Sequence, residues 1–386
     1  MNQQKTAAFS YIDGHRDEMI SLWQELVTME SGSLHKAGVD AVAKRIGQVL
    51  DDVGAKTEFV EFEQAGNLLV SHVDATTEAP SVIFMGHMDT VFKTGTVAQR
   101  PFCIKDGKAY GPGVLDMKGG IVAFLYALKA LKAAGYDKRP LKVLLAGDEE
   151  VGHEHSTAAK RMMAEAKGAA AAFNCETGFI DDGIVVGRKG TARFIVAVKG
   201  VAAHAGNDPE NGRNAIIELA HKAIAIQALT DWEEGTTVNV GVISGGSVAN
   251  AVPEHAQIVV DIRYKKPEAI VKMEESIRSV AAKTYIEGTT TTVTRRPGIE
   301  AMETTAGVKE LFALVAKVYE ENGFGKPYEK AVGGGADSAY TVMAGVPTVC
   351  AMGVKGERNH SPEEYALVES LFERAKLLAA CVLELD

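Results

Sequence analysis

The sequence predicts an α/β protein in which a three-layer α/β/α domain is interrupted by a smaller α+β domain. Apolar strands alternate with amphipathic helices up to residue 173, and a different order of elements, β-α-β-β-α-β, follows. Long α/β elements return after Pro297. The expected domains are therefore 1–187 together with 298–386, and an inserted domain over 188–297.

The first part of the chain begins with helices and then alternates between strands and helices. Apolar residues recur at helical spacing over residues 19–27 and 39–50. Apolar runs that alternate with helical patterns are typical of a sheet with helices on both faces. The expected strands are 68–73, 81–85, 141–146 and 169–173, and the expected helices are 120–134 and 156–165.

The inserted domain is predicted from a second pattern. Phe194, Val196 and Val198 alternate with more polar neighbours, as in a half-buried strand. The order of elements is ferredoxin-like, and this two-layer arrangement leaves a sheet face or edge to be covered. We therefore expect it to pair with a second copy. Its expected elements are strand 192–199, helix 215–229, strands 237–243 and 256–264, helix 267–285 and strand 289–294.

The return segment completes the first domain with helix 306–322, strand 347–351 and helix 368–385. His360 lies in this segment. A site that uses His360 is therefore completed only after the chain returns from the inserted domain.

The composition is that of an ordinary globular protein and excludes several classes of function. The chain has 386 residues, 46% of them hydrophobic, and a net charge of -10, so no basic surface invites nucleic acid. No apolar run approaches the roughly 20 residues that span a bilayer. The N-terminus lacks a signal-peptide pattern, so we expect a cytoplasmic protein. The four cysteines have no paired spacing and are expected to be reduced and buried.

Five residues of the types that bind divalent metals are spread over most of the chain. Four of them follow or terminate an apolar or small-residue run, and ligands of open α/β sheets bind at the carboxyl ends of the strands. Two imidazoles and three carboxylates suit two metals that share a carboxylate, with a spare acid beside them as base. This set indicates a hydrolase. The five are His87, Asp116, Glu150, Glu176 and His360.

Neighbouring residues supply further roles. Asp89 lies two positions after His87 in an extended segment, so its carboxylate can accept the second ring N–H of that histidine. Asp116 lies among glycines at the start of a helix, and its two oxygens can bridge two cations. Glu149 and Glu150 point in different directions, so we assign Glu150 to the metal and Glu149 to general base. Each motif alone also fits a structural use, such as a helix N-cap or a solvated loop, and only the set favours a metal site.

Together these motifs resemble the M20 family of metallopeptidases, most closely its glutamate carboxypeptidase branch. The resemblance covers nearly the whole chain and implies a di-zinc exopeptidase-like catalytic domain with an inserted ferredoxin-like dimerisation (lid) domain. The matching segments are Gly-His-Met-Asp-Thr-Val at 86–91, Tyr-Gly-Pro-Gly through Asp-x-Lys-Gly-Gly at 110–120, Asp-Glu-Glu at 148–150, Glu176, and Gly-Gly-Gly-Ala-Asp at 333–337.

The resemblance implies two zinc ions bridged by Asp116. One ion would be completed by His87 and Glu176, and the other by Glu150 and His360. Glu149 would be base and acid, and Asp89 would hold His87. Oxygen and imidazole ligands also accept manganese or cobalt.

The resemblance also assigns roles in the inserted domain. His204 looks like the family's histidine that enters the partner subunit's active site and stabilises the oxyanion. Asn250, Arg263 and Arg296 match family positions around the substrate, where an arginine fork suits a carboxylate. Either arginine would equally serve as a surface charge.

The chain departs from the family at His153 and His155, where small residues are usual. Those histidines would either lie on the surface or alter the rim of the pocket.

The expected function is metal-dependent hydrolysis of an amide bond. A glutamate carboxypeptidase-like exopeptidase would release a C-terminal amino acid through a metal-activated water, with Glu149 as base. An N-acyl-amino-acid deacylase with the same site stays open. In the family that the chain resembles, glutamate at the position of Glu176 is typical of carboxypeptidases and deacylases, and aspartate is typical of aminopeptidases. Glu176 therefore favours the first two classes. A non-catalytic, metal-stabilised dimer is disfavoured because a binding module needs no base. The expected partners are a small peptide or N-acyl-amino-acid substrate and a second copy of the chain, with no nucleic acid and no membrane.

Overall fold

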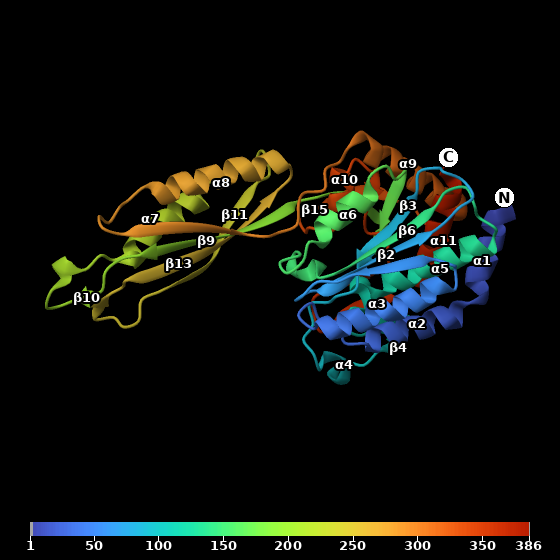
Figure 1. Cartoon of the computed structure of the whole chain (residues 1–386), viewed down its shortest axis with the longest axis horizontal. Coiled ribbons are helices and arrows are strands. Elements are labelled where there is room, and N and C mark those ends of the chain that lie inside the picture. The colour runs from blue at the N-terminus through green and yellow to red at the C-terminus, as the bar shows by residue number, and fades with distance from the viewer. Residues whose placement is uncertain (1–2, 386) are drawn as a thin grey trace. The chain divides into compact units, whose positions relative to one another are not determined.

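The computed structural model describes residues 3–385, and the chain divides into two compact units (Figure 1). Met1 and Asn2, which belong to the N-terminal stretch without a signal-peptide pattern, lie outside the described residues, as does Asp386. The first unit comprises Met1–Gly187, Glu303–Val332 and Ala336–Asp386, and the second comprises Arg188–Met302 with Gly333–Gly335.

The second unit extends five residues beyond the expected boundary at 297. Backbone hydrogen bonds explain this difference. Thr191 N donates to Ile299 O at 2.7 Å, and Arg188 N donates to Met302 O at 3.0 Å. Residues 298–302 therefore close against the start of the inserted segment.

A six-stranded sheet in the order β1-β2-β6-β3-β7-β16 forms the centre of the first unit. The pairs β6–β3, β3–β7 and β7–β16 are parallel. The pairs β1–β2 and β2–β6 are antiparallel. The carboxyl ends of the parallel strands therefore share one edge. The strands are β1 (Lys56–Val60), β2 (Gly66–Val73), β3 (Val82–His87), β6 (Leu141–Gly147), β7 (Ala171–Asn174) and β16 (Thr348–Val349).

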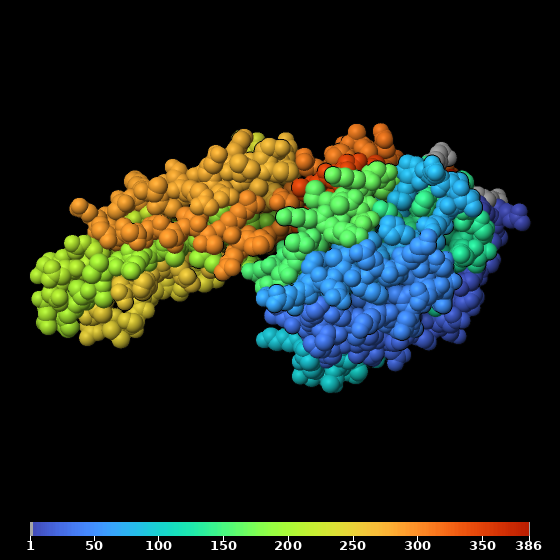
Figure 2. All heavy atoms as spheres, in the orientation of Figure 1, coloured from blue at the N-terminus to red at the C-terminus, as the bar shows by residue number. Residues whose placement is uncertain are grey.

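Helices lie on both sides of this sheet (Figure 1). Helix α5 is buried over nearly its whole length because α1, α2, α11 and β3 pack around it. Phe84 of β3 lies between Phe124 of α5 and Phe173 of β7, with ring centroids 5.9 and 6.1 Å away. The helices are α1 (Gln3–Gly14), α2 (Arg16–Thr28), α3 (Lys36–Asp51), α4 (Thr96–Gln99), α5 (Gly119–Ala133), α6 (Ala158–Ala166), α9 (Ala306–Asn322), α10 (Ser338–Met343) and α11 (Val368–Glu384). In the space-filling view, the visible face of this unit is formed mostly by the N-terminal part of the chain, in blue (Figure 2).

Several short strands of the first unit were not expected from the sequence. They form a sheet in the order β17-β18-β5-β4 and a pair β15-β8. Most have only two or three residues, too few for a pattern of period two. Cys103 lies on β4 and is exposed, so its expected burial is wrong, whereas the other three cysteines are buried. These strands are β4 (Cys103–Lys105), β5 (Lys108–Tyr110), β8 (Gly183–Arg188), β15 (Tyr328–Val332), β17 (Gly356–Glu357) and β18 (Tyr365–Leu367).

The second unit has the expected ferredoxin-like order. Its antiparallel sheet has the order β11-β13-β9-β14, and alternate residues of β9 and β13 are buried against α7 and α8. A short antiparallel pair, β10 with β12, lies between these elements in sequence. The bounds are β9 (Gly190–Lys199), β10 (Ala203–His204), α7 (Ala215–Gln227), β11 (Thr237–Gly245), β12 (Ala251–Val252), β13 (His255–Tyr264), α8 (Pro267–Ala282) and β14 (Thr290–Arg296).

Among the described residues, no helix combines the length and the apolar character needed to cross a membrane.

Candidate active site

The ends of three parallel strands bring predicted site residues to one edge of the first unit's sheet. His87 is the last residue of β3, and Glu176 comes two residues after β7. Glu149 and Glu150 follow β6 after one intervening residue, Asp148. Because the strands are parallel, their carboxyl ends lie at the same edge of the sheet, and these side chains come close together there.

Asp116 joins this group through a close approach of two backbones. It lies in the irregular turn Val114–Lys118 before α5. A Cβ on Gly120, at the start of α5, would lie 1.9 Å from the carbonyl oxygen of Cys175. Only glycine permits this approach, which brings the Asp116 turn beside the segment that carries Glu176.

His87 forms the buried half of the cluster. Its Nε2 lies 3.2 Å from Asp116 Oδ1 and 3.4 Å from Glu176 Oε1. The His87 side chain is 1% exposed, and both carboxylates are 8% exposed. One imidazole and two carboxylates therefore converge in the interior.

His360 forms the second half, at the surface. Its Nε2 lies 3.2 Å from Asp116 Oδ2 and 3.1 Å from Glu150 Oε2. The two oxygens of Asp116 thus face two different imidazoles, as expected for a bridging carboxylate. Asn359 also donates from Nδ2 to Asp116 Oδ2 at 3.0 Å.

This set of donors suits two divalent cations. The ligand atoms of His87, Asp116 and Glu150 lie within 4.8 Å of one another, and imidazole nitrogens with carboxylate oxygens are ordinary zinc ligands. Each half offers three protein donors when Asp116 is shared, which leaves room for water or substrate. Burial raises the pKa of Glu150 to about 7, although the hydrogen bond from His360 acts to lower it. Cations here would offset the cost of crowding these buried carboxylates.

Glu149 lies beside the buried half of the cluster. Its carboxylate and the donors of His87 and Glu176 lie within 4.8 Å of one another. Burial raises its pKa well above the ordinary range, the charge of His87 opposes this, and nearby carboxylates add to it. Glu149 is thus a buried acid in contact range of the predicted ligands, in addition to the five that the sequence assigned to the metals.

Asp89 holds His87 in a different way from the one expected. The closest contact of His87 Nδ1 is with the Asp89 backbone carbonyl, at 3.0 Å, and Asp89 Oδ1 is 3.4 Å away. The Asp89 carboxylate accepts hydrogen bonds from the backbone N–H groups of Glu149 at 3.2 Å and Glu150 at 3.1 Å. Asp89 therefore orients the acidic turn as well as the histidine.

Glu364 is a residue of the site that the sequence did not suggest. Its buried carboxylate accepts hydrogen bonds from the backbone N–H groups of Gly113, Leu115 and Asp116, at 2.8–3.1 Å. Burial raises its pKa to about 7, although these hydrogen bonds oppose the rise. Glu364 thus fixes the turn that carries Asp116. Its position in an exposed-looking Pro-Glu-Glu segment gave no signal of this role.

His153, for which the sequence left the surface and the rim of the pocket open, also lies beside the acidic turn. It is buried, with Nδ1 2.9 Å from Asp148 Oδ1 and Nε2 2.7 Å from Asp337 Oδ1. Burial lowers its pKa, but the two aspartates raise it by more, to well above the ordinary value. His155 is exposed and His153 is buried, so the expected surface position applies only to His155. A histidine three residues after Glu150 was the only available signal.

The remaining predicted residues belong to the second unit. His204 on β10 is exposed, and its Nδ1 accepts hydrogen bonds from the backbone N–H groups of Gly206 and Asn207, both at 3.1 Å. Nε2 therefore carries the ring proton and is available as a donor. Asn250 is hydrogen-bonded to the same segment, because Ala205 N donates to the Asn250 backbone carbonyl oxygen at 3.0 Å. Arg263 Nε donates to Asp261 Oδ2 at 2.8 Å, and Arg296 is the last residue of β14.

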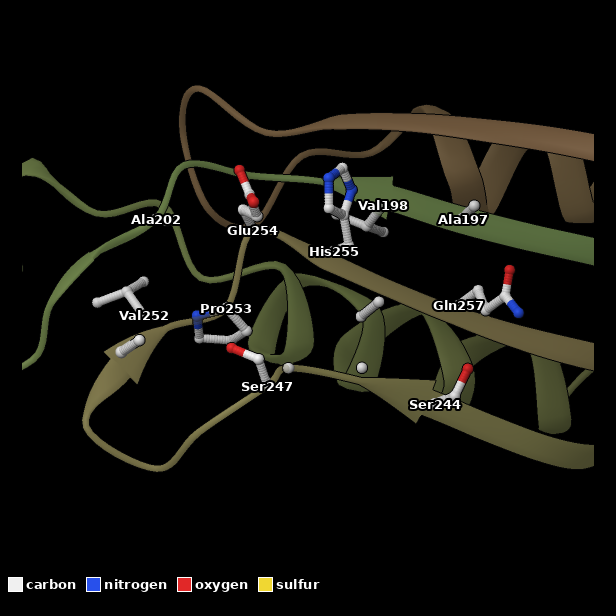
Figure 3. A pocket seen from close by; sticks show the side chains of 14 residues that line it. Ala197, Val198, Ala202, Ser244, Ser247, Val252, Pro253, Glu254, His255 and Gln257 are labelled. Carbon is white, nitrogen blue, oxygen red and sulfur yellow. The ribbon is translucent and has the colours of Figure 1, made fainter.

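A cavity of about 590 Å³ lies in the second unit, and Val252, Pro253 and Glu254 are among the residues that line it (Figure 3). Ser244, Ser247, Glu254, His255 and Gln257 supply its polar lining. Asp116, Glu150 and the other predicted metal ligands all lie in the first unit.

The fold and the cluster together define the class of a metal-dependent hydrolase. The sequence profile of peptidase family M20/M25/M40 matches residues 83–384, and this chain belongs to that family. It is accordingly an enzyme, an M20-type metallohydrolase, and the predicted fold class is confirmed.

Relatives within the family differ in their substrates. Carboxypeptidase G2 of Pseudomonas sp. (strain RS-16) is 28% identical over 95% of this chain and 89% of its own length. A succinyl-diaminopimelate desuccinylase of Dechloromonas aromatica is 30% identical over 69% of this chain and 73% of its own. The crystal structure of aminopeptidase PepT from Bacillus cereus has a TM-score of 0.78 and 25% identity, with coverage of 96% and 98% of the two chains.

Proposed function

We propose that this chain is a glutamate carboxypeptidase-like exopeptidase that releases a C-terminal amino acid by hydrolysis of an amide bond. The observation that carries the proposal is Glu149, a buried carboxylate whose oxygen lies within 4.8 Å of the donor atoms of His87 and Glu176. It is left over when each proposed ion takes three of the five predicted ligands, with Asp116 shared. An acid in that position suits a general base. The similarity to Carboxypeptidase G2 over 95% of the chain supports the carboxypeptidase assignment.

Two zinc ions are the proposed cofactors, with manganese or cobalt as alternatives that the same donors accept. His87, Asp116 and Glu176 would hold one ion, and His360, Asp116 and Glu150 the other. When bound, the ions supply a Lewis acid for the scissile carbonyl and lower the pKa of water.

The chain's own residues move the proton and orient the reactants. Glu149 takes a proton from the attacking water and passes it to the leaving amine. Asp89 keeps His87 and the Glu149–Glu150 turn in place. Asn250, Arg263 and Arg296 are the proposed contacts of the substrate, and an arginine fork would bind its carboxylate.

A homodimer is part of the proposal. We assign to His204 of the partner subunit the hydrogen bond that stabilises the oxyanion, and the donor at its Nε2 supports this role. Strand β11 is an edge strand with exposed Val242 and Ile243, and unpaired apolar edges favour association. We keep the cytoplasm as the proposed compartment.

A substrate panel tests the activity. N-acylglutamates, other N-acyl-amino acids and unblocked dipeptides are compared with zinc supplied and then chelated. Release of C-terminal glutamate that stops on chelation is the expected result. Preference for small acyl groups irrespective of the amino acid would identify a deacylase, the alternative that the desuccinylase relative favours. A requirement for a free N-terminus would identify an aminopeptidase.

A further inference from the structure

The four-stranded sheet of the second unit carries a group of charged side chains on the face that points away from α7 and α8. Alternate residues of β9 and β13 are buried against these two helices. The residues between them point to the opposite face, and residues directly across from one another on neighbouring strands share a face. The group consists of Arg193 on β9, Asp261 and Arg263 on β13, and Arg296 on β14.

The register of the sheet places two arginines of this group directly opposite each other. Arg193 pairs with Arg296 on one neighbouring strand and with Asp261 on the other. Opposed residues of an antiparallel pair have Cβ atoms about 4.5–5.5 Å apart, and like charges in such positions destabilise the sheet. Asp261 does not relieve this repulsion alone, because Arg263 Nε already donates to its Oδ2 at 2.8 Å. An anion on this face would offset the cost.

Arg295, the neighbour of Arg296 on β14, shows how an arginine of the same strand serves the fold. It points to the other face of the sheet, where its Nη1 lies 3.1 Å from Glu274 Oε2 on α8. Arg193, in contrast, is exposed, and its side chain forms no ion pair or hydrogen bond with any residue that the structure describes. The Arg193 guanidinium is therefore available to a ligand.

Two lysines add positive charge at this end of the sheet. Lys189 directly precedes β9, and Lys265 directly follows β13. Burial lowers the pKa of Lys189, and the charges of Lys265 and Arg263 lower it further. A surface with this potential attracts a ligand that carries more than one negative charge.

We infer that Arg193 binds the side-chain carboxylate of an acidic leaving amino acid, while Arg263 and Arg296 bind its α-carboxylate. This inference rests on the proposed function, which assigns Arg263 and Arg296 to the substrate. Glutamate carries two carboxylates, and a planar guanidinium can bind a carboxylate through two parallel hydrogen bonds. A neutral amino acid would leave the Arg193 charge without a partner. Arg193 is thus a residue that determines specificity for an acidic C-terminal residue.

The test compares N-acylglutamate with N-acylglutamine, which have nearly the same shape and differ by one charge. Both carry the acyl group that the substrate panel favours. Arg193→Gln is expected to lower the ratio of the two kcat/KM values, glutamate over glutamine, at least tenfold, because a hydrogen bond to a charged group is lost. Arg193→Lys keeps the charge without the planar fork and should retain part of the preference.

Two further measurements serve as controls. Lys199→Gln removes an exposed cation from the same face at the other end of β9, and it should keep the wild-type ratio. Urea unfolding should show no loss of stability in Arg193→Gln, since this substitution removes the repulsion with Arg296.

The outcomes separate this inference from the proposed function. Equal kcat/KM values for the two compounds in the wild-type enzyme, or an unchanged ratio in Arg193→Gln, would overturn the inference and leave the hydrolase in place. If neither compound is hydrolysed, the proposed function fails, and calorimetric titration with glutamate and with glutamine decides the inference. Tighter binding of glutamate that Arg193→Gln abolishes would support it, and equal binding or no binding would overturn it.

Discussion

His153 shows how single buried residues hold the acidic turn in place. Its ring connects Asp148, which directly precedes Glu149, with Asp337 at the start of α10. All three side chains are at most 4% exposed. The ring therefore fixes the position of the turn that carries the proposed base.

We predict that His153→Asn destabilises the enzyme and lowers kcat. Asparagine is shorter and cannot reach both aspartates, and breaking a buried ion pair typically costs about 3–5 kcal/mol. Displacement of Glu149 should lower kcat roughly tenfold with little change in KM, because small misplacements of catalytic groups are costly. Urea unfolding and steady-state kinetics measure both effects. His155→Asn, at an exposed position, is the control, and wild-type stability and kcat in the His153 variant would refute this role.

At the scale of elements, a buried ion pair on α7 connects this helix to the end of α8 and to the residues that follow it. Lys222 Nζ lies 2.9 Å from Glu218 Oε1, and both side chains are 1% exposed. The lysine donates to the Ala281 carbonyl at 2.7 Å, and Glu218 accepts from Tyr285 N at 2.8 Å and Ile286 N at 2.6 Å. Both side chains of the ion pair therefore also form hydrogen bonds with the backbone.

Removal of the lysine should strongly destabilise the second unit. Lys222→Met leaves the Glu218 carboxylate buried without its cation, with an expected loss of about 3–5 kcal/mol. The free energy of unfolding, measured in urea, checks this. Lys272→Met on the exposed face of α8 should stay within about 0.5 kcal/mol of wild type. Similar stability of the two variants would contradict the argument.

The same pair predicts a pH dependence of stability. Burial raises the pKa of Glu218, but Lys222 and the two backbone N–H groups lower it by more, so the net pKa is lowered. A lowered folded pKa stabilises the protein above the unfolded pKa of about 4.3, and this contribution is lost as the pH falls through the folded pKa. The difference in unfolding free energy between wild type and Glu218→Gln should therefore shrink on acidification below about pH 4.3. A constant or growing difference would be inconsistent with this sign.

The edge strand β11 carries the prediction about assembly. Ile243 is 61% exposed on β11, and Ile224 is 73% exposed on α7, which contacts that strand. A lysine on an edge strand opposes pairing with another chain. Ile243→Lys is expected to convert a wild-type dimer into a monomer in sedimentation velocity, whereas Ile104→Lys in the first unit should leave it unchanged. A monomeric wild type, or a dimeric Ile243 variant, would refute the proposed interface.

At the scale of the whole molecule, most of the fold was predictable because its strands and helices have strong patterns. The parallel strands are apolar runs and the strands of the second unit alternate in polarity, so these strands were predicted. Strand β1 of the central sheet was missed, because its side chains are exposed or only partly buried. The strands β4, β5, β17 and β18 have two or three residues each, which is too short for periodicity to reveal. Their order depends on contacts distant in sequence.

The candidate site was predictable only where a motif marked it. His87, Asp116, Glu149, Glu150, Glu176 and His360 lie in recognisable segments, and the structure brings all six together. Glu364 was missed because its role depends on backbone N–H groups about 250 residues away in sequence. His153 was left undecided because its second partner, Asp337, is 184 residues away. Such partners are fixed by the tertiary fold and leave no local pattern.

The most direct test of the central claim is Glu149→Gln, assayed on the preferred substrate of the panel with bound zinc measured in the same preparation. Glutamine keeps the size of the side chain and removes its basicity. We predict wild-type zinc content and a kcat at least about 100-fold lower, the contribution of a general base. Wild-type enzyme treated with a chelator should lose its activity, and Glu63→Gln, at an exposed glutamate, should behave as wild type. Near-normal turnover in the zinc-loaded Glu149 variant would contradict the account.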